Sequence, residues 1–199
     1  MKKIITTLLF ASALTLSGCS SLNMPPQSEY TIATKAVSAS NLAPRTGKTI
    51  LVSAPIAAPG FQSRNMIYVL TPFELQSYTQ SRWVAPPANM LNSVLVNAIE
   101  ATRYFKAVVA PPFIGKTNYQ LNTYLVSIEQ SFLRPTSRVN LVLSATLVNA
   151  ETLQVLAAKT FVYHADAPAN NAYSGVIAAN QAASWVAKQV ARFVVEAAR

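Results

Sequence analysis

The stretch that decides the fold covers residues 139–147 and reads VNLVLSATL. Apolar and polar residues alternate along it, which is typical of a β-strand with one buried face and one solvated face. The buried face is expected to hold Val139, Leu141, Leu143, Ala145 and Leu147, and the solvated face Asn140, Ser144 and Thr146. Residues 149–154 then predict a turn, and residues 155–164 predict the returning strand of an antiparallel hairpin.

A second long alternating segment, Tyr119 to Phe132, precedes this hairpin. Its pattern places Tyr124, Val126 and Ile128 on one side of a strand and Leu125 and Ser127 on the other. Shorter β-branched or apolar runs predict strands at residues 30–32, 49–52, 66–70 and 105–110. Residues 73–87 are expected to lead into the first helix.

Two segments have the spacing of three and four residues that is typical of an amphipathic helix. The first carries Met90, Leu91, Val94, Leu95, Ala98 and Ile99; the second, from about Tyr173 to Ala198, carries Val176, Ala179, Ala183, Val186, Val190 and Phe193. The sequence therefore predicts an α+β fold, with a mostly antiparallel sheet and two amphipathic helices packed on one face. We expect a single domain over residues 30–199.

The first 18 residues have the organisation of a secretory signal peptide. Lys2 and Lys3 form a charged start, an apolar run of 13 residues follows from Ile4 to Leu16, and Leu16-Ser17-Gly18-Cys19 matches a lipobox. The run is shorter than the roughly 20 residues that span a bilayer. We expect cleavage before Cys19, acylation of its thiol and amine with chains such as palmitate, and firm anchoring in a membrane.

Residues 19–29 are expected to be the lipidated N-terminus and a tether. Ser20 to Glu29 includes Pro25-Pro26, lacks periodicity, and reaches at most about 35 Å when extended. Ser20 stands at the position after the lipidated cysteine, where aspartate favours retention in the inner membrane of Gram-negative bacteria. Serine rather than aspartate at this position therefore predicts sorting to the outer membrane.

Composition and charge narrow the classes of function. The chain is 51% hydrophobic and 12% charged, which is too apolar for a disordered protein. After removal of Lys2 and Lys3, 14 basic residues stand against 7 acidic ones, a net charge of +7. The basic residues are scattered, as on an ordinary solvated surface, although anionic lipid headgroups or an acidic partner protein would also suit them. An exported chain without basic runs is not expected to bind nucleic acid.

The sequence offers no constellation of catalytic or metal-binding residues. The single histidine, His164, has only Asp166 close by in sequence, which is below the number of ligands that a metal site needs. The five glycines never take a phosphate-binding spacing, and no Gly-x-Ser-x-Gly elbow occurs. We expect neither an enzyme nor a bound cofactor.

Aromatic residues and prolines gather between a predicted strand and the first helix: Tyr68, Pro72, Phe73, Tyr78, Trp83, Pro86 and Pro87. Aromatic side chains on loops can anchor a partner or a lipid. Alternatively, Phe73 and Trp83 cap the core where the chain crosses the end of the sheet.

These residues resemble the ABC-type transport auxiliary lipoprotein family, which includes lipoproteins encoded with paraquat-inducible MCE-domain transport systems. The resemblance rests on Tyr68 to Pro72, Tyr78 and Arg82-Trp83-Val84-Ala85-Pro86-Pro87, followed by Met90-Leu91. It extends to the lipobox, Tyr30-x-Ile32, Tyr104 to Val108, the turn at 149–155 and the terminal helix.

The resemblance implies a non-catalytic, periplasm-facing outer-membrane lipoprotein that docks a tunnel-forming MCE protein and supports lipid transport. The family offers no catalytic motif to transfer, so Cys19 alone receives a chemical role. Tyr78, Arg82 and Trp83 are candidates for partner binding, with maintenance of the fold as the alternative. A homo-oligomer also stays open. Two other hypotheses are an envelope lipoprotein that regulates cell-wall or outer-membrane assembly, and a lipid carrier with its own pocket.

Overall fold

The computed structural model describes residues 26–33 and 46–199. The signal peptide and Cys19 lie outside these residues. The elements in chain order are β1 (Ser28–Tyr30), β2 (Thr49–Val52), β3 (Ile56–Ala57), β4 (Asn65–Val69), β5 (Gln76–Trp83), α2 (Pro87–Ala101), β6 (Ala107–Val109), β7 (Tyr119–Ser131), β8 (Arg138–Asn149), β9 (Val155–Asp166) and α3 (Ala172–Ala197). In the described part of the chain, no helix is long and apolar enough to cross a membrane.

The three long strands β7, β8 and β9 form an antiparallel meander, as predicted. Leu125 on β7 pairs with Leu143 on β8, which pairs with Phe161 on β9. All five residues expected on the inner face of β8 are buried, the most accessible of them being 3% exposed. The alternating stretch at 139–147 therefore lies at the centre of the core.

A β-bulge in β7 overturns one detail of the predicted pattern. The register between β7 and β8 shifts between Leu125 and Ser127, because one extra residue stands opposite β8 there. Ile128 is therefore buried on the same face as Leu125, whereas Tyr124 and Val126 are exposed on the other. The prediction that Ile128 shares a face with Tyr124 and Val126 is wrong.

The sheet is mixed, so the prediction of a mostly antiparallel sheet is wrong. Strands β2, β3 and β4 follow one another along the edge of β7 that β8 leaves free, and all three run parallel to β7. The pairs β1–β5 and β2–β6 are also parallel, which makes five of the eight pairings parallel. Hydrophobic alternation fixes which face of a strand is buried but carries no information on the direction of its neighbour.

The sequence pattern missed β5, which spans eight residues. Its sequence QSYTQSRW is largely polar, so it lacks the apolar alternation that marks β7 and β8. It pairs antiparallel with β4 and parallel with β1. Strand β1 begins at Ser28, so Ser28 and Glu29 are paired in the sheet although we expected them in the tether.

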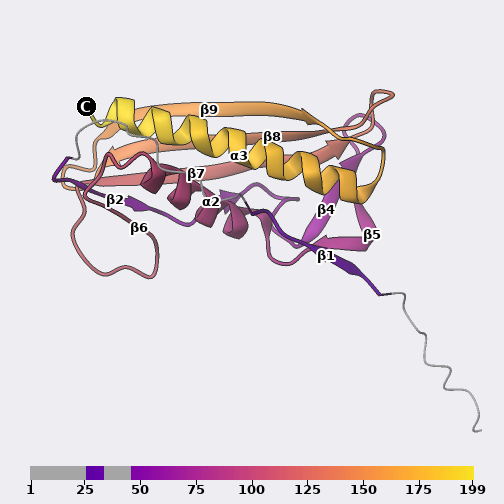
Figure 1. Cartoon of the computed structure of the whole chain (residues 1–199), viewed down its shortest axis with the longest axis horizontal. Coiled ribbons are helices and arrows are strands. Elements are labelled where there is room, and N and C mark those ends of the chain that lie inside the picture. The colour runs from indigo at the N-terminus through magenta and orange to yellow at the C-terminus, as the bar shows by residue number, and fades with distance from the viewer. Residues whose placement is uncertain (1–25, 34–45) are drawn as a thin grey trace, which may run out of the picture.

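Both helices cover the inner face of the sheet and contact each other (Figure 1). The apolar residues predicted to face the core are buried in α2 and, except for the half-buried Phe193, in α3. Helix α3 lies across β8 and β9, and its buried alanines allow close packing on these strands. The molecule is elongated, and the beginning of β1 and the C-terminus lie at opposite ends (Figure 1).

Candidate functional site

The three residues that we singled out as partner-binding candidates, Tyr78, Arg82 and Trp83, all lie on β5. They lie near the end of the molecule where β1 begins, which we call the tether end. Tyr78 and Trp83 line one small internal cavity, whereas the side chain of Arg82 is partly exposed, so the three do not form a shared exposed surface. Cys19, the predicted lipidation site, lies outside the described residues.

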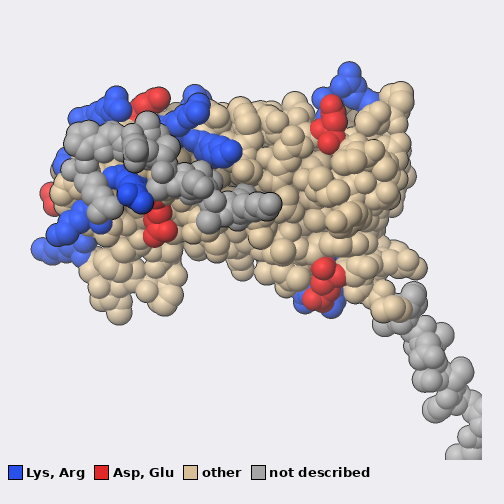
Figure 2. Space-filling model, viewed as in Figure 1, with Lys and Arg blue, Asp and Glu red and all other residues tan. Residues whose placement is uncertain are grey.

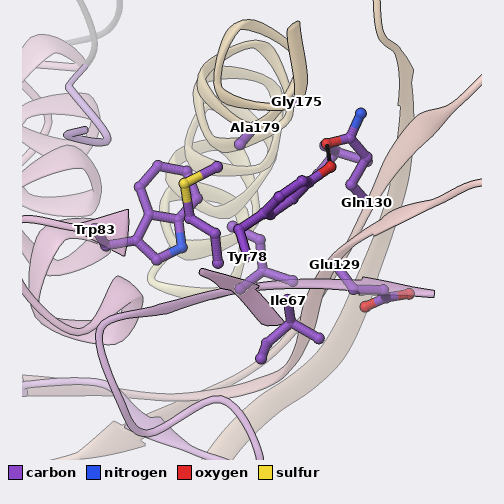
Figure 3. Close-up of a pocket in the computed structure, with 10 residues that line it drawn as sticks. Ile67, Tyr78, Trp83, Glu129, Gln130, Gly175 and Ala179 are labelled. Atoms are coloured by element: carbon purple, nitrogen blue, oxygen red, sulfur yellow. Dashed lines mark hydrogen bonds between the residues drawn. The ribbon is translucent and has the colours of Figure 1, made fainter. Parts of the chain in front are cut away.

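Tyr78 reaches a buried polar cluster where β7 meets the start of α3 (Figure 3). Its hydroxyl donates a hydrogen bond to Oε1 of Gln130 at 3.0 Å. The amide Nε2 of Gln130 donates to Oγ of Ser137 at 2.9 Å and to the backbone carbonyl of Asn171 at 3.2 Å. Asn171 caps α3 by accepting a bond from the backbone N–H of Ser174. The cluster thus joins β5, β7 and α3.

Gly175 makes room for this cluster. A Cβ atom at residue 175 would lie 2.0 Å from Oε1 of Gln130, far inside van der Waals contact. Any side chain at Gly175 would therefore push Gln130 away from Tyr78. The sequence did not predict a role for Gln130 or Gly175. A glutamine at an inward position of an apolar strand was a signal that could have identified Gln130.

Burial makes Tyr78 a permanent hydrogen-bond donor. Burial, with a smaller contribution from Tyr68, raises the pKa of Tyr78 to about 12. The ring of Tyr68 lies 4.7 Å from that of Tyr78 between centroids. The phenol therefore stays protonated at any physiological pH, and it suits a structural contact better than proton transfer.

The cavity beside Tyr78 is small. Its volume is about 10 Å³, at the lower limit of what a single water molecule needs, and Ile67, Trp83 and Ala179 are among its lining residues (Figure 3). Pockets for drug-sized ligands measure roughly 300 to 1,000 Å³. This cavity therefore has no space for an acyl chain.

Arg82 holds the first strand of the domain. Its Nε donates to Oε1 of Glu29 at 2.9 Å, and its Nη2 contacts the same oxygen. Nη2 of Arg64 donates to that oxygen at 2.7 Å. The hydrogen bond from Arg82 is the main reason that the pKa of Glu29 is lowered, although desolvation opposes it. Glu29 pairs with Arg82 in the register of β1 and β5, so this clamp fastens the strand that follows the tether.

Trp83 is a core residue. Its side chain is 4% exposed, and its backbone exchanges hydrogen bonds with Arg64, whose Nε donates to the carbonyl of Trp83 at 3.0 Å. A buried indole cannot touch a partner. The geometry favours maintenance of the fold over partner binding for Tyr78 and Trp83, and it gives Arg82 a role in the clamp.

Glu129 is a half-buried carboxylate on β7. Burial raises its pKa, even though Asn140 and Ser127 donate hydrogen bonds to it. Asn140 Nδ2 lies 3.1 Å from Glu129 Oε1, and Asn140 Oδ1 lies 2.7 Å from Nδ1 of His164. These three residues face one another across β7, β8 and β9. Within residues 26–33 and 46–199, no group of three or more His, Cys, Asp or Glu side chains could hold a metal ion.

Two solved structures show the same fold. A Xanthomonas campestris protein assigned to the DUF330 family superposes with a TM-score of 0.79 at 22% identity, covering 86% of this chain and 96% of its own. An uncharacterized protein superposes with a TM-score of 0.68 at 13% identity, covering 85% and 99%. At sequence identities of 22% and 13%, these similarities support a shared fold and nothing further. A search of curated protein sequences finds no match.

The family is shown by the sequence itself. The sequence profile described as "ABC-type transport auxiliary lipoprotein component" matches residues 30–191, which include every element from the end of β1 to most of α3. The match confirms the resemblance carried by the region around Tyr78 and Arg82-Trp83. The chain therefore belongs to the ABC-type transport auxiliary lipoprotein family.

Proposed function

We propose that this protein is a non-catalytic outer-membrane lipoprotein subunit of an MCE-type ABC lipid transport system. In this role it faces the periplasm and docks the periplasm-spanning MCE protein. The observation that carries the proposal is the family match over residues 30–191. The named family acts with an ABC transporter, and the finer assignment to MCE systems follows from the resemblance described above.

The beginning of the domain suits a membrane anchor. Cys19 ends a lipobox, and Ser20 favours transfer to the outer membrane. Only eight residues lie between Cys19 and Ser28, and the nine steps from one Cα atom to the next span at most about 32 Å. The ion pairs of Glu29 with Arg64 and Arg82 then join the tether to the sheet. A force on the tether is passed to β5 and β4 rather than to a loose terminus.

The polar cluster supports a structural role rather than a catalytic one. It consists of a phenol with a raised pKa, a carboxamide, a hydroxyl and backbone groups. None of these is an activated nucleophile or a base poised near neutral pH. The neighbouring cavity is also too small to carry lipid, so the protein is expected to act through a partner.

Affinity purification tests the proposal. The tagged, lipidated protein is isolated from detergent-solubilised envelopes, with a tagged outer-membrane lipoprotein of another family as the control. The MCE-domain subunit should be enriched with this protein and absent from the control. Repeated recovery without the MCE subunit would contradict the proposal. Altered cell-wall cross-linking after gene deletion, with normal detergent resistance, would favour the envelope-assembly alternative.

A further inference from the structure

The excess positive charge lies at one end of the molecule, which we call the basic end (Figure 2). Here β7 and β9 begin, and β8 and both helices end. Tyr104, just after α2, and Tyr119, at the start of β7, both donate hydrogen bonds from their hydroxyls to the carbonyl of Ala198 and so fasten the end of α3. Five cations on strands and loops belong to this end: Lys48, Arg103, Lys106, Lys116 and Lys159. Three more lie in the second half of α3 or just after it: Lys188, Arg192 and Arg199.

The charge balance differs sharply between the two ends. The eight cations of the basic end face three carboxylates, Glu100, Glu151 and Glu196, a balance of 8 − 3 = +5. The tether end has four arginines and four carboxylates, a balance of 4 − 4 = 0. The arginines are Arg64, Arg82, Arg134 and Arg138, and the carboxylates belong to Glu29, Glu74, Glu129 and Asp166. The whole excess charge of the described residues thus belongs to the basic end.

This excess is not neutralised within the protein. All seven acidic residues of the chain lie in the part that the structure describes, since residues 1–25 and 34–45 contain no Asp or Glu. Among the described residues, ion pairs closer than 4 Å join only Arg64 and Arg82 to Glu29, at the tether end. All eight cations of the basic end are exposed.

The basic end also has a recess for a side chain of a partner. A hollow of about 280 Å³ opens between the end of α2 and β6, and Ile99, Phe105 and Val108 are among the apolar residues that line it. Arg103, Lys106 and one carboxylate, Glu100, also line it, so the charged residues of the hollow have a balance of 2 − 1 = +1. An acidic side chain seated between Arg103 and Lys106 would meet two cations against the one carboxylate of Glu100, over an apolar floor where screening by water is weaker than on an open surface.

We propose that the basic end is the docking surface for an acidic face of the partner protein, with Arg103 and Lys106 at its centre. This inference rests on the proposed function, because it assigns a face to the docking of the MCE subunit. Complementary charge of this kind steers encounter and fixes orientation, and added salt weakens it.

The position of the tether favours a protein partner over the anchoring membrane. The basic end and the beginning of β1 lie at opposite ends of the molecule (Figure 1). The 12 residues of β8, which run between the two ends, span about 40 Å. The tether reaches at most about 32 Å from the membrane to Ser28. With the tether end toward the membrane, the basic end projects into the periplasm.

Charge reversal tests the assignment. The full lipidated protein in detergent is titrated with the purified periplasmic region of the MCE subunit from the same transport system. The double variant Arg103→Glu, Lys106→Glu should bind about tenfold more weakly than the wild type near 0.15 M salt. The matched control Arg134→Glu, Arg138→Glu changes the net charge equally at the tether end and should bind within about twofold of the wild type. Circular dichroism establishes that both variants are folded.

The outcomes separate this inference from the proposed function. If the wild type binds and the two double variants lose affinity equally, or not at all, the basic end is not the docking surface. If the wild type does not bind the MCE subunit, the proposed function itself fails. Vesicles with and without phosphatidylglycerol provide the other arm. If the Arg103 and Lys106 variant lost binding to anionic vesicles but kept its affinity for the MCE subunit, the basic end would be a lipid-binding surface and the inference would be overturned.

Discussion

The tether end and the basic end of this elongated domain use their polar residues in opposite ways. At the tether end, Glu29 forms ion pairs with Arg64 and Arg82, and Tyr78 donates a hydrogen bond to Gln130. These polar groups therefore make their contacts within the protein. At the basic end, eight exposed cations face three carboxylates without forming an ion pair among the described residues. We propose from this difference that the two ends have separate roles, in which one end carries the lipid anchor and the other meets a partner.

The largest expected effect comes from removing the anchor. In Cys19→Ala the lipidation site is lost, so nearly all of the protein should move from the outer membrane to the soluble or inner-membrane fraction. Fractionation of envelopes measures this. Because Cys19 precedes the sheet, the circular dichroism spectrum and the affinity of the basic end for the MCE subunit should stay unchanged. A variant that stayed in the outer membrane and functioned normally would show that Cys19 is not the anchor.

Gly175→Ala should cause the largest loss of stability. The added methyl would meet Oε1 of Gln130 at 2.0 Å and separate Gln130 from Tyr78. We expect a net loss of about 2 kcal/mol in the free energy of unfolding, measured in urea, because the three disrupted hydrogen bonds of Gln130 outweigh the roughly 1 kcal/mol that alanine gains over glycine in a helix. The matched control is Gly47→Ala at the basic end, where a Cβ atom would meet nothing within 4 Å. Equal losses in the two variants would contradict the packing argument.

Tyr78→Phe tests how much the hydrogen bond from Tyr78 to Gln130 stabilises the fold. It removes the hydrogen bond to the buried amide of Gln130 and leaves the ring in place. The expected loss is about 1 to 2 kcal/mol in the free energy of unfolding. Tyr173→Phe, at a residue that is 60% exposed, is the control and should change little. Partner affinity should be the same in both variants; a selective loss of affinity in Tyr78→Phe would restore Tyr78 as a binding residue.

The smallest effect is the dependence of the Glu29 clamp on pH. The arginines lower the pKa of Glu29 in the folded state, so its ion pairs stabilise the fold above the ordinary carboxyl pKa of 4.5 and are lost as pH falls through the lowered value. Unfolding curves of the wild type and Glu29→Gln should therefore differ slightly at pH 7 and converge at acid pH. The difference should also shrink in high salt, because the clamp is exposed. A difference that grew toward acid pH would contradict the clamp.

The buried faces of the long elements were predictable from sequence, whereas strand direction was not. Residues 139–147 and the apolar stripes of α2 and α3 alternate with the period of their structures, because each buries one face in a common core. The bulge near Val126 and the parallel pairing of β2, β3 and β4 with β7 depend on neighbours distant in sequence. Strand β5 was missed because polar residues form most of it.

The candidate site was predictable only in part. The motif around Tyr78, Arg82 and Trp83 identified the family, but it did not reveal that Trp83 is buried or that Arg82 holds Glu29. Such contacts join strands that are 53 residues apart in sequence. The asymmetry of charge was hidden for the same reason, since the cations are scattered along the chain and gather only when it folds.

Photo-crosslinking in living cells tests the division between the two ends most directly. A photoreactive amino acid is placed at Lys106 in the basic end or at the exposed Gln80 on β5 in the tether end, in the otherwise native lipoprotein. We predict that irradiation joins the protein to the MCE subunit from residue 106 and not from residue 80. Crosslinks from residue 80 alone, or equally from both residues, would contradict the account.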